Sequence, residues 1–264
     1  MTVHRARRRF GQHFLTDETV LDRMVGEVAP RPGERLLEIG PGTGALTGRL
    51  LESVGVLTAV EIDRDLVGAL RSRFPALALV QGDVLRIDLE SLIGQGPPWR
   101  IVGNLPYNIS TPLLVKLLAH SPYVRDMHFL LQKEVVDRLC AEPGTKAWGR
   151  LSVAMQYRCE VIALFDVPPV HFRPRPKVHS TFVRILPKPT LAPLADPAAL
   201  DTILRFAFSG RRKTLRNALK PLELDWRQVP VDAGARPDQI GVEAYLLLAN
   251  HLTARSTAGQ DTAA

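Results

Sequence analysis

A short strand, a glycine-rich turn and a helix follow one another near the start of the chain, and this succession restricts the fold more than any other feature. Residues 35–39 predict the strand, residues 40–45 (Gly-Pro-Gly-Thr-Gly-Ala) the turn, and the leucine and valine spacing between Leu46 and Val54 the helix. Glycines at such a turn let the backbone approach a ligand beside the N-terminus of the helix. We therefore expect the first half of a nucleotide-binding βαβ unit, and an α/β fold.

Acidic residues follow the next two predicted strands. The strand at residues 56–60 leads into Glu61, where a carboxylate can accept both ribose hydroxyls of an adenosine-containing cofactor. The strand at residues 77–80 leads to Asp83, which can accept a hydrogen bond from an adenine amino group or form an ordinary turn. The glycine turn also matches the pattern G-x-G-x-x-G/A, so by itself it fits a nicotinamide enzyme and a methyltransferase equally well.

The tetrapeptide Asn104-Leu105-Pro106-Tyr107 follows a fourth apolar strand at residues 99–103. Pro106 stiffens this loop because a proline disfavours helix at the preceding residue. The loop presents an amide oxygen, backbone carbonyls and an aromatic ring, which suit a flat nitrogen heterocycle with an exocyclic amine. Tyr107 can stack on the base, while Asn104 and a backbone carbonyl accept the amine hydrogens. The alternative is an ordinary Asn-Pro turn beside a buried tyrosine.

The remaining patterns divide the chain into two parts. Residues 111–120, 132–143 and 151–158 are predicted helices, and residues 127–131, 161–167 and 178–186 are predicted strands. Since the last two strands have no long helix between them, we expect a mostly parallel sheet with an antiparallel edge pair. The proline-rich residues 187–197 mark a domain boundary. We therefore predict a first domain over residues 1–190, a small all-helical domain over residues 191–255, and a disordered tail over residues 256–264.

Positive charge is concentrated in three stretches that contain no Asp or Glu. These stretches, residues 5–9, 171–189 and 205–220, hold close to half of the 34 Lys and Arg residues, so acids are in excess elsewhere although the net charge is +7. Clustered Lys and Arg gain from phosphate contact and counterion release, which predicts a polyanionic partner. The alternative for any one stretch is a solvated surface.

The composition is that of an ordinary soluble protein of the cytoplasm. No apolar run approaches the roughly 18 to 20 residues that a membrane span needs, and the arginine-rich N-terminus lacks the apolar core of a signal peptide. Cys140 and Cys159 have no metal-ligand spacing and predict buried thiols in a reducing compartment. We expect no metal site, no membrane contact and, since no pairing surface is evident, a monomer.

In this order, the motifs resemble those of the ribosomal RNA adenine N6,N6-dimethyltransferases. The resemblance rests on residues 38–44 (Glu-Ile-Gly-Pro-Gly-Thr-Gly), 60–63 (Val-Glu-Ile-Asp), 82–83 (Gly-Asp) and 104–107. Residues 11–15, 131–134, 172–178 and 211–217 resemble the bacterial small-subunit branch, the KsgA-type enzymes. The similarity extends from about residue 7 to about residue 252. The glycine turn alone is a weak signal, but the ordered set is very specific.

The resemblance implies a fold, a cofactor and a reaction. The fold would be a Rossmann-like class I methyltransferase with a small C-terminal helical domain, and the cofactor S-adenosyl-L-methionine. The reaction would dimethylate N6 of two adjacent adenosines in a hairpin loop near the 3′ end of small-subunit (16S) rRNA. The small ribosomal subunit would be the partner, and a role in its assembly is also implied.

The resemblance also implies roles for single residues. The predicted cofactor contacts are His13, Leu15, Gly40, Gly42, Glu61, Asp83, Val84 and Asn104. The predicted catalytic loop is Asn104, Leu105, Pro106 and Tyr107, and the predicted substrate contacts are Tyr107, Phe172, Arg211, Arg212, Lys213 and Arg216. Tyr107 and Phe172 would hold the two faces of the target base. His13 departs from the Asn that is common at its position, which leaves open whether its side chain or its backbone serves.

Three other functions fit parts of the sequence. An NAD-dependent dehydrogenase would use the same glycine turn, but it explains neither residues 104–107 nor the basic stretches. An adenine methyltransferase of large-subunit rRNA would share the catalytic motifs. A ribosome assembly factor would dock through the basic stretches, with methyl transfer secondary, and this role is compatible with the first.

Overall fold

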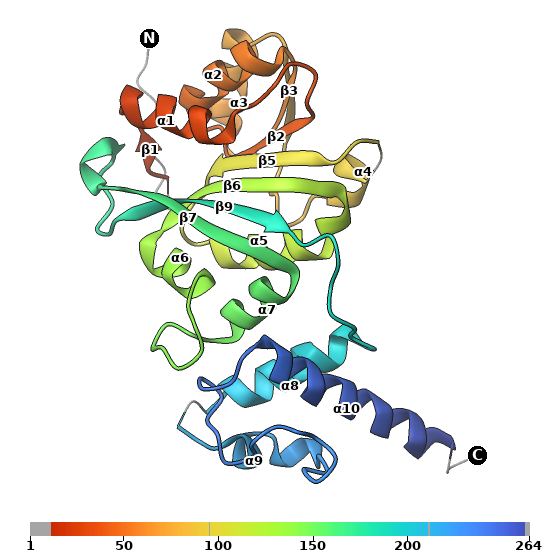
Figure 1. Ribbon diagram of the computed structural model, residues 1–264. Helices are drawn as coiled ribbons and strands as arrows, with labels where there is room; N and C mark the ends of the chain where they lie inside the picture. The colour runs from red at the N-terminus through yellow and green to blue at the C-terminus, as the bar shows by residue number, and fades with distance from the viewer. Residues whose placement is uncertain (1–11, 95, 211, 262–264) are drawn as a thin grey trace. The chain divides into compact units, whose positions relative to one another are not determined.

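The computed structural model describes residues 12–94, 96–210 and 212–261 (Figure 1). The chain forms two compact units. The first contains the chain up to Val136 together with Cys159–Pro187, and the second contains Asp137–Arg158 and the chain from Lys188 onward. The predicted boundary near residue 190 therefore coincides with a change of unit. In contrast, residues 137–158 belong with the C-terminal helices rather than with the first domain, where the sequence analysis placed them.

A seven-stranded sheet forms the centre of the first unit (Figure 1). Its spatial order is β4 (Leu77–Gln81), β3 (Leu57–Glu61), β2 (Leu36–Ile39), β5 (Trp99–Asn104), β6 (Val124–Gln132), β9 (Ser180–Pro187) and β7 (Cys159–Val167). The strands from β4 to β6 are parallel, whereas β9 is antiparallel to both of its neighbours. This confirms the predicted parallel sheet with an antiparallel pair at one edge.

Helices connect consecutive parallel strands as in a doubly wound fold: α2 (Ala45–Val54), α3 (Arg64–Arg73), α4 (Leu89–Ile93) and α5 (Ser110–Ala119). Helix α1 (Glu18–Val28) precedes β2, and α6 (Lys133–Leu139) follows β6. The 3-10 turns η2 (Ser121–Tyr123) and η3 (Pro169–His171) lie before β6 and after β7. A second, two-stranded sheet pairs β1 (Phe14–Leu15) with β8 (Phe172–Arg173). It joins the start of the described chain to the segment that precedes β9.

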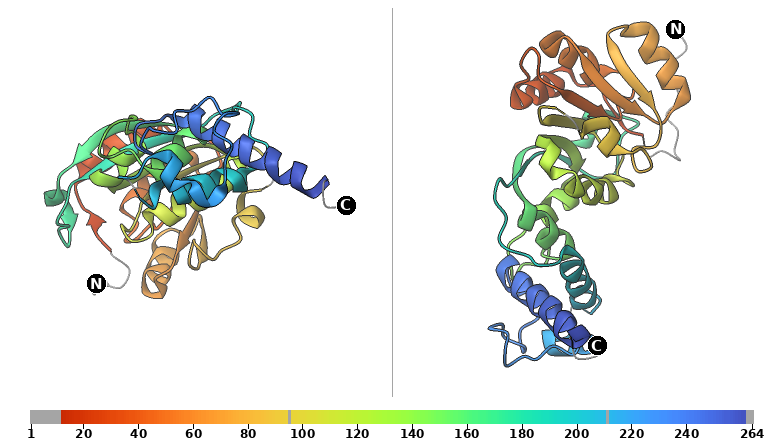
Figure 2. Two further views of the ribbon diagram at one scale, coloured as in Figure 1. Left: turned by 90° about the horizontal axis from the view of Figure 1, so that it is seen from below. Right: turned by 90° about the vertical axis from the view of Figure 1, so that its right-hand side faces the viewer.

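The second unit is helical, as predicted. It contains α7 (Arg150–Arg158), α8 (Pro197–Phe208), α9 (Leu215–Ala218), the 3-10 turn η4 (Lys220–Leu222) and α10 (Val242–Asp261). Helix α10 lies alongside α8 (Figure 2), and Ile203 and Leu204 share one buried cluster with Tyr245 and Leu248. Helix α10 continues into the predicted disordered tail, and residues 262–264 lie outside the described part of the chain.

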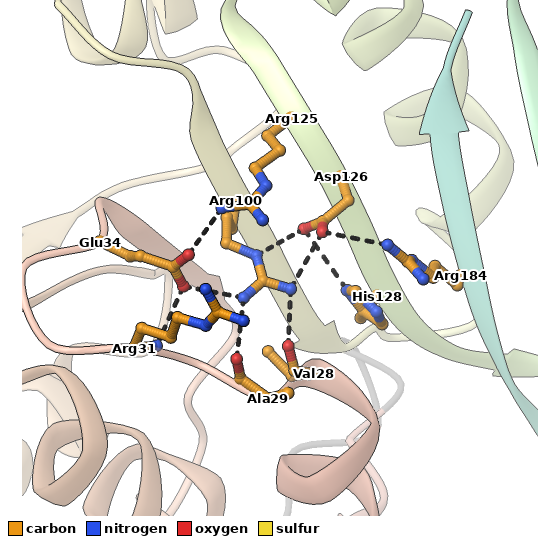
Figure 3. A network of polar contacts seen from close by, with 9 residues as sticks. All are labelled: Val28, Ala29, Arg31, Glu34, Arg100, Arg125, Asp126, His128 and Arg184. Atoms are coloured by element: carbon orange, nitrogen blue, oxygen red, sulfur yellow. Dashed lines mark hydrogen bonds and ion pairs between the residues drawn. The ribbon is translucent and has the colours of Figure 1, made fainter.

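A buried charge network ties α1 to the sheet at the amino ends of the parallel strands (Figure 3). Arg100 on β5 makes two hydrogen bonds of 2.9 Å to Asp126 on β6 and one of 2.9 Å to Glu34. It also donates to the backbone oxygens of Val28 and Ala29 at the C-terminus of α1. These carbonyls have no partner within the helix, so the guanidinium caps α1 and fixes it against the strands.

The strand order reverses between β2 and β5, whose carboxyl ends lie side by side. Open α/β sheets bind their ligands in the crevice at such a switch point. The glycine turn follows β2 and residues 104–107 end β5, so the fold brings the two strongest sequence motifs together. Cys159 is buried as expected, but Cys140 is exposed. Among the described residues, no helix is both long and apolar enough to span a membrane.

Candidate functional site

A cavity of about 290 Å³ lies at the carboxyl ends of β2, β3, β4 and β5. All of the predicted cofactor contacts and the whole predicted catalytic loop line it: His13, Leu15, Gly40, Gly42, Glu61, Asp83, Val84, Asn104, Leu105, Pro106 and Tyr107. These residues come from segments far apart in the sequence. Parallel pairing gathers those that follow β2, β3, β4 and β5, because it places every carboxyl end at the same edge of the sheet. His13 and Leu15 reach the cavity from the segment of β1, which belongs to the second sheet.

The glycine turn forms one wall of the cavity. At two of its positions the backbone conformation or the space available favours glycine over a residue with a side chain. Gly40 and Gly42 have φ angles of 70° and 59°, which side chains rarely adopt. A Cβ on Gly42 would lie 3.1 Å from the ring of Phe14. A larger residue would therefore strain the turn and push β1 away from the cavity.

Glu61 ends β3 with its carboxylate turned toward the glycine turn. Its side chain accepts hydrogen bonds from the backbone N–H of Gly42 at 3.1 Å and from that of Asp63 at 2.9 Å. Burial raises the pKa of Glu61, and these backbone hydrogen bonds partly offset the effect. A buried carboxylate that already accepts two N–H donors is well suited to receive hydroxyl donors from a ribose.

Glu38 is a second cavity-lining carboxylate, and the sequence analysis gave it no role. It lies in the middle of β2, is 2% exposed and accepts a hydrogen bond of 2.7 Å from the hydroxyl of Thr47. Burial raises the pKa of Glu38 to about 7, with a contribution from the nearby charge of Glu61. A charged residue within the apolar run Leu-Leu-Glu-Ile was the signal that could have identified it.

The turn after β4 forms another wall of the cavity. Asp83 and Val84 line it, and Ile62 adds an apolar side chain that is 41% exposed. Oδ1 of Asp83 accepts a hydrogen bond from the backbone N–H of Leu85 at 2.9 Å. Within the described residues, the contact of its Oδ2 is with the exposed Arg86, at 3.6 Å. This carboxylate oxygen can accept a hydrogen bond from an amino group in the cavity.

The side-chain amide of Asn104 is oriented by the chain itself. Its Nδ2 donates to the backbone oxygen of His13 at 3.0 Å. Since the nitrogen is fixed by a carbonyl, Oδ1 is the atom that can accept from a ligand amine. The oxygen of Pro106 accepts from the N–H of Ile109 and the hydroxyl of Ser110, which holds the loop against the start of α5.

Tyr107 is held from two sides. Its hydroxyl and that of Ser180 are 2.8 Å apart, and the ring centroid lies 5.4 Å from that of His13 with a tilt of 31°. Burial raises the pKa of Tyr107, so the phenol stays neutral near pH 7. Nδ1 of His13 lies 2.7 Å from the backbone oxygen of Pro174 and must carry a proton, because a carbonyl can only accept. Thus the His13 side chain braces the loop, while its backbone oxygen orients Asn104.

The structure does not bring every predicted substrate contact to the cavity. Phe172 is fully buried in the core beside β1 and does not line it. Its place opposite Leu15 in the β1–β8 pair explains this burial. Arg212, Lys213 and Arg216 are exposed in the second unit, and Arg211 lies outside the described residues.

An amide oxygen and an aromatic ring that suit an amine-bearing base face the same cavity as the glycine turn and Glu61. Together with the strand order, this arrangement defines a class I methyltransferase. The family model for ribosomal RNA adenine dimethylase matches residues 3–253. The chain belongs to this family, and it is a ribosomal RNA methyltransferase that uses a methyl donor of the S-adenosylmethionine type. The nicotinamide dehydrogenase considered above is therefore wrong.

Curated relatives and solved structures agree with this assignment. The chain is 51% identical over 256 residues to ribosomal RNA small subunit methyltransferase A of Pseudomonas aeruginosa, covering 94% of this chain and 95% of the relative. It is 50% identical over 260 residues to the protein of the same name from Chromohalobacter salexigens, covering 95% and 92%.

Among solved structures, a dimethyladenosine transferase from Plasmodium falciparum has a TM-score of 0.74 at 26% identity, covering 89% of this chain and 96% of that one. The 23S rRNA methyltransferase ErmE has a TM-score of 0.69 at 26% identity, covering 91% and 99%.

Proposed function

We propose that the protein transfers methyl groups from S-adenosyl-L-methionine to N6 of two adjacent adenosines in the 3′-terminal hairpin loop of small-subunit (16S) rRNA. It would act as a monomer in the cytoplasm and contribute to subunit assembly. The observation that carries the proposal is the fixed amide of Asn104, whose Oδ1 is left to accept from an amine at the cavity wall.

Positioning accounts for most of the proposed chemistry. The sulfonium methyl of the cofactor is already electrophilic, so the protein must chiefly present an amine lone pair in line with it. Oδ1 of Asn104 and the backbone oxygen of Leu105 accept the two amine hydrogens, which directs the lone pair of nitrogen away from the ring. Pro106 keeps these acceptors rigid, and Tyr107 stacks on the adenine.

The cavity residues suit the cofactor part by part. Glu61 would hold the ribose hydroxyls, and Asp83 with Val84 the adenine. Gly40 and Gly42 would lie beneath the methionine part, where the left-handed backbone of the turn leaves room. His13 and Leu15 would close the cavity from the N-terminal side.

The segment at residues 173–179 is suited to contact RNA beside the target base. Two residues that line the cavity hold it near both ends, because His13 contacts the oxygen of Pro174 and Tyr107 contacts Ser180. Its bases Arg173, Arg175 and Lys177 are exposed. They would bind phosphates that flank the flipped adenosine. Phe172 would reach the base only if the β1–β8 pair opened.

The degree of sequence identity to known proteins favours the small ribosomal subunit over the large one as the substrate. Relatives that are named for the small subunit are about half identical over nearly the whole chain, whereas the 23S enzyme ErmE is 26% identical. The second candidate, an assembly factor, is supported by the exposed bases of the second unit and can coexist with catalysis.

The deciding experiment is methyl transfer from labelled S-adenosyl-L-methionine to purified small subunits that lack the modification. Large subunits are the parallel substrate, and the product nucleosides are identified after digestion. We expect N6,N6-dimethyladenosine on the small subunit only. Label only on the large subunit would overturn the choice of substrate.

An Asn104→Ala variant separates catalysis from docking. It should bind small subunits as the unmodified protein does and transfer no methyl groups. Full transfer by this variant would refute the role of Asn104. If the unmodified protein binds cofactor and subunits but transfers nothing, the assembly factor becomes the better description.

A further inference from the structure

Lys116 makes an unusual set of contacts close to the cavity. It lies on α5, the helix that follows the catalytic loop, and its side chain is half-buried. Its ammonium donates to three backbone oxygens, those of Val84 at 3.1 Å, Leu85 at 3.0 Å and Ile87 at 2.6 Å. A lysine has three donor hydrogens, so this set of carbonyls uses all of them. No carboxylate pairs with Lys116 in the described part of the chain.

These three carbonyls belong to the turn that carries the adenine end of the cavity. In a trans peptide the C=O and the following N–H point in opposite directions. When Lys116 draws the oxygen of Val84 toward α5, the N–H of Leu85 must point the other way. It does so, and donates to Oδ1 of Asp83 at 2.9 Å. The peptide plane that Lys116 contacts therefore also supplies the N–H that occupies one oxygen of Asp83, and the other oxygen is left for a ligand.

The same contacts connect two parts of the site that are distant in sequence. Helix α5 begins with Ser110, whose hydroxyl binds the oxygen of Pro106 in the catalytic loop. About 1.7 turns further along the helix, Lys116 binds the 84–87 turn. The adenine end of the cavity and the catalytic loop are thus fixed to one helix, which keeps the distance between them constant.

We propose that Lys116 is a positioning residue that makes the cavity selective for the adenine amino group of the cofactor. It acts through the 84–87 turn and Asp83, and it need not touch the cofactor. This inference rests on the proposed function, in which Asp83 accepts from that amino group. Without Lys116 the turn would lose its charge-assisted hydrogen bonds and Asp83 its fixed orientation.

The test is ligand discrimination by Lys116→Met, which keeps the length of the apolar stem. Calorimetry would compare S-adenosylhomocysteine with S-inosylhomocysteine, in which an oxo group replaces the amine. We expect the unmodified protein to prefer the adenosyl ligand, and the variant to lose about tenfold in affinity for it, the worth of one hydrogen bond to a charged group. The affinity of the variant for the inosyl ligand should stay within about twofold of that of the unmodified protein, so the preference for the adenosyl ligand falls. The KM for S-adenosyl-L-methionine should rise while kcat at saturation is kept.

Control variants make the result decisive. Val115→Met changes the neighbouring, 52% exposed residue on the same helix and should alter neither affinity. Lys116→Gln retains hydrogen-bond donors without the charge, so its preference for the adenosyl over the inosyl ligand should be intermediate. This variant provides the test if Lys116→Met fails to fold. If Lys116→Met loses affinity equally for both ligands, or keeps its affinity for both, the inference is overturned. If the unmodified protein binds neither ligand, the proposed function fails first, and this outcome is distinct because it appears before any substitution.

Discussion

Glu38 combines burial with a position that matters for the cavity. Its carboxyl group is enclosed by the core of the first unit, and its pKa is raised from 4.5 to about 7. The folded state therefore holds this proton more tightly than the unfolded state does. Stability associated with the protonated form is fully present below about pH 4.5 and is lost as the pH rises through about 7.

Replacement of Glu38 by Gln should remove this pH dependence. A shift of this size corresponds to about 3 kcal/mol of unfolding free energy between pH 4.5 and pH 8. Urea denaturation at pH 5 and pH 8 would measure it. We expect the unmodified protein to lose stability relative to Glu38→Gln over this interval. The exposed Glu52→Gln should follow the unmodified protein, and parallel behaviour of all three would contradict the pKa.

At this scale the sequence predicted most of the candidate residues that the fold gathers at the cavity, because they follow strands and glycine turns in a recognisable order. It did not predict the residues that hold them in place. Lys116 and Ser180 look like ordinary helix and strand residues, and their roles depend on which backbone passes beside them in the fold. Phe172 was expected at the cavity, but its pairing opposite Leu15 buries it.

Among the elements, α1 depends most on a buried ionic contact. Arg100 holds the C-terminus of α1 and pairs with Asp126, which is 1% exposed (Figure 3). His128 contributes no charge near pH 7, because burial lowers its pKa to about 4. Arg184 is 3.8 Å from Asp126, so among the described residues Arg100 supplies the close positive partner of this carboxylate.

Arg100→Met should therefore destabilise the protein by about 3 kcal/mol, since it leaves a buried carboxylate without its main partner. Equilibrium urea denaturation measures this cost. Arg100→Met combined with Asp126→Asn should cost less than the sum of the two single changes. Arg125→Met is the matched control, because Arg125 is exposed and binds Glu34 only at the surface. If the two single variants lose amounts of unfolding free energy that add up to the loss in the double variant, Arg100 and Asp126 do not act as a unit.

The sequence patterns predicted the strands of the large sheet, but they predicted neither the helices α3 and α4 nor the strands β1 and β8. The strands of the large sheet have clear apolar runs, which do not depend on distant parts of the chain. In contrast, β1 and β8 are two residues long, too short for any period to be detected. Contacts between residues distant in sequence lie beside this pair, those of Thr16 and Asp17 with His171.

For the molecule as a whole, exposed bases occur in both units. Arg175 and Lys177 lie in the first, and Arg212 and Lys213 in the second. If both sets bind ribosomal RNA, each contact contributes a separate electrostatic free energy, and the effects should add because each set would neutralise different phosphates.

We therefore predict additive salt effects on binding to small subunits. Each lost phosphate contact reduces the magnitude of the negative slope of log K against log[salt] by about 0.7 to 0.9. Arg175→Gln with Lys177→Gln should reduce it by about 1.5, the corresponding pair in the second unit by a similar amount, and all four by the sum. Arg227→Gln is the control, because this arginine is already paired with Asp225. An unchanged slope in either pair would exclude that surface from RNA contact.

The proline-rich residues 187–197 led to a predicted boundary near residue 190, and the second unit resumes at Lys188. Residues 137–158 also group with the second unit, although the sequence prediction included them in the first domain. The membership of this segment is set by Trp148, Val153 and Tyr157, which pack into the core of the helical unit. This burial depends on contacts with helices that are distant in sequence, so the sequence of the segment alone does not predict it.

The position of β9 has a consequence for the order of events during synthesis. This strand lies between β6 and β7, yet it is made after both. Strand β7 has no other neighbour, so it cannot join the sheet until residues 180–187 have left the ribosome. Until then β6 keeps an open edge, which is the kind of surface that pairs wrongly with other chains. The nascent enzyme thus contains all of the residues that line the cavity before its sheet is complete, because β9 is the last strand of the sheet to be made.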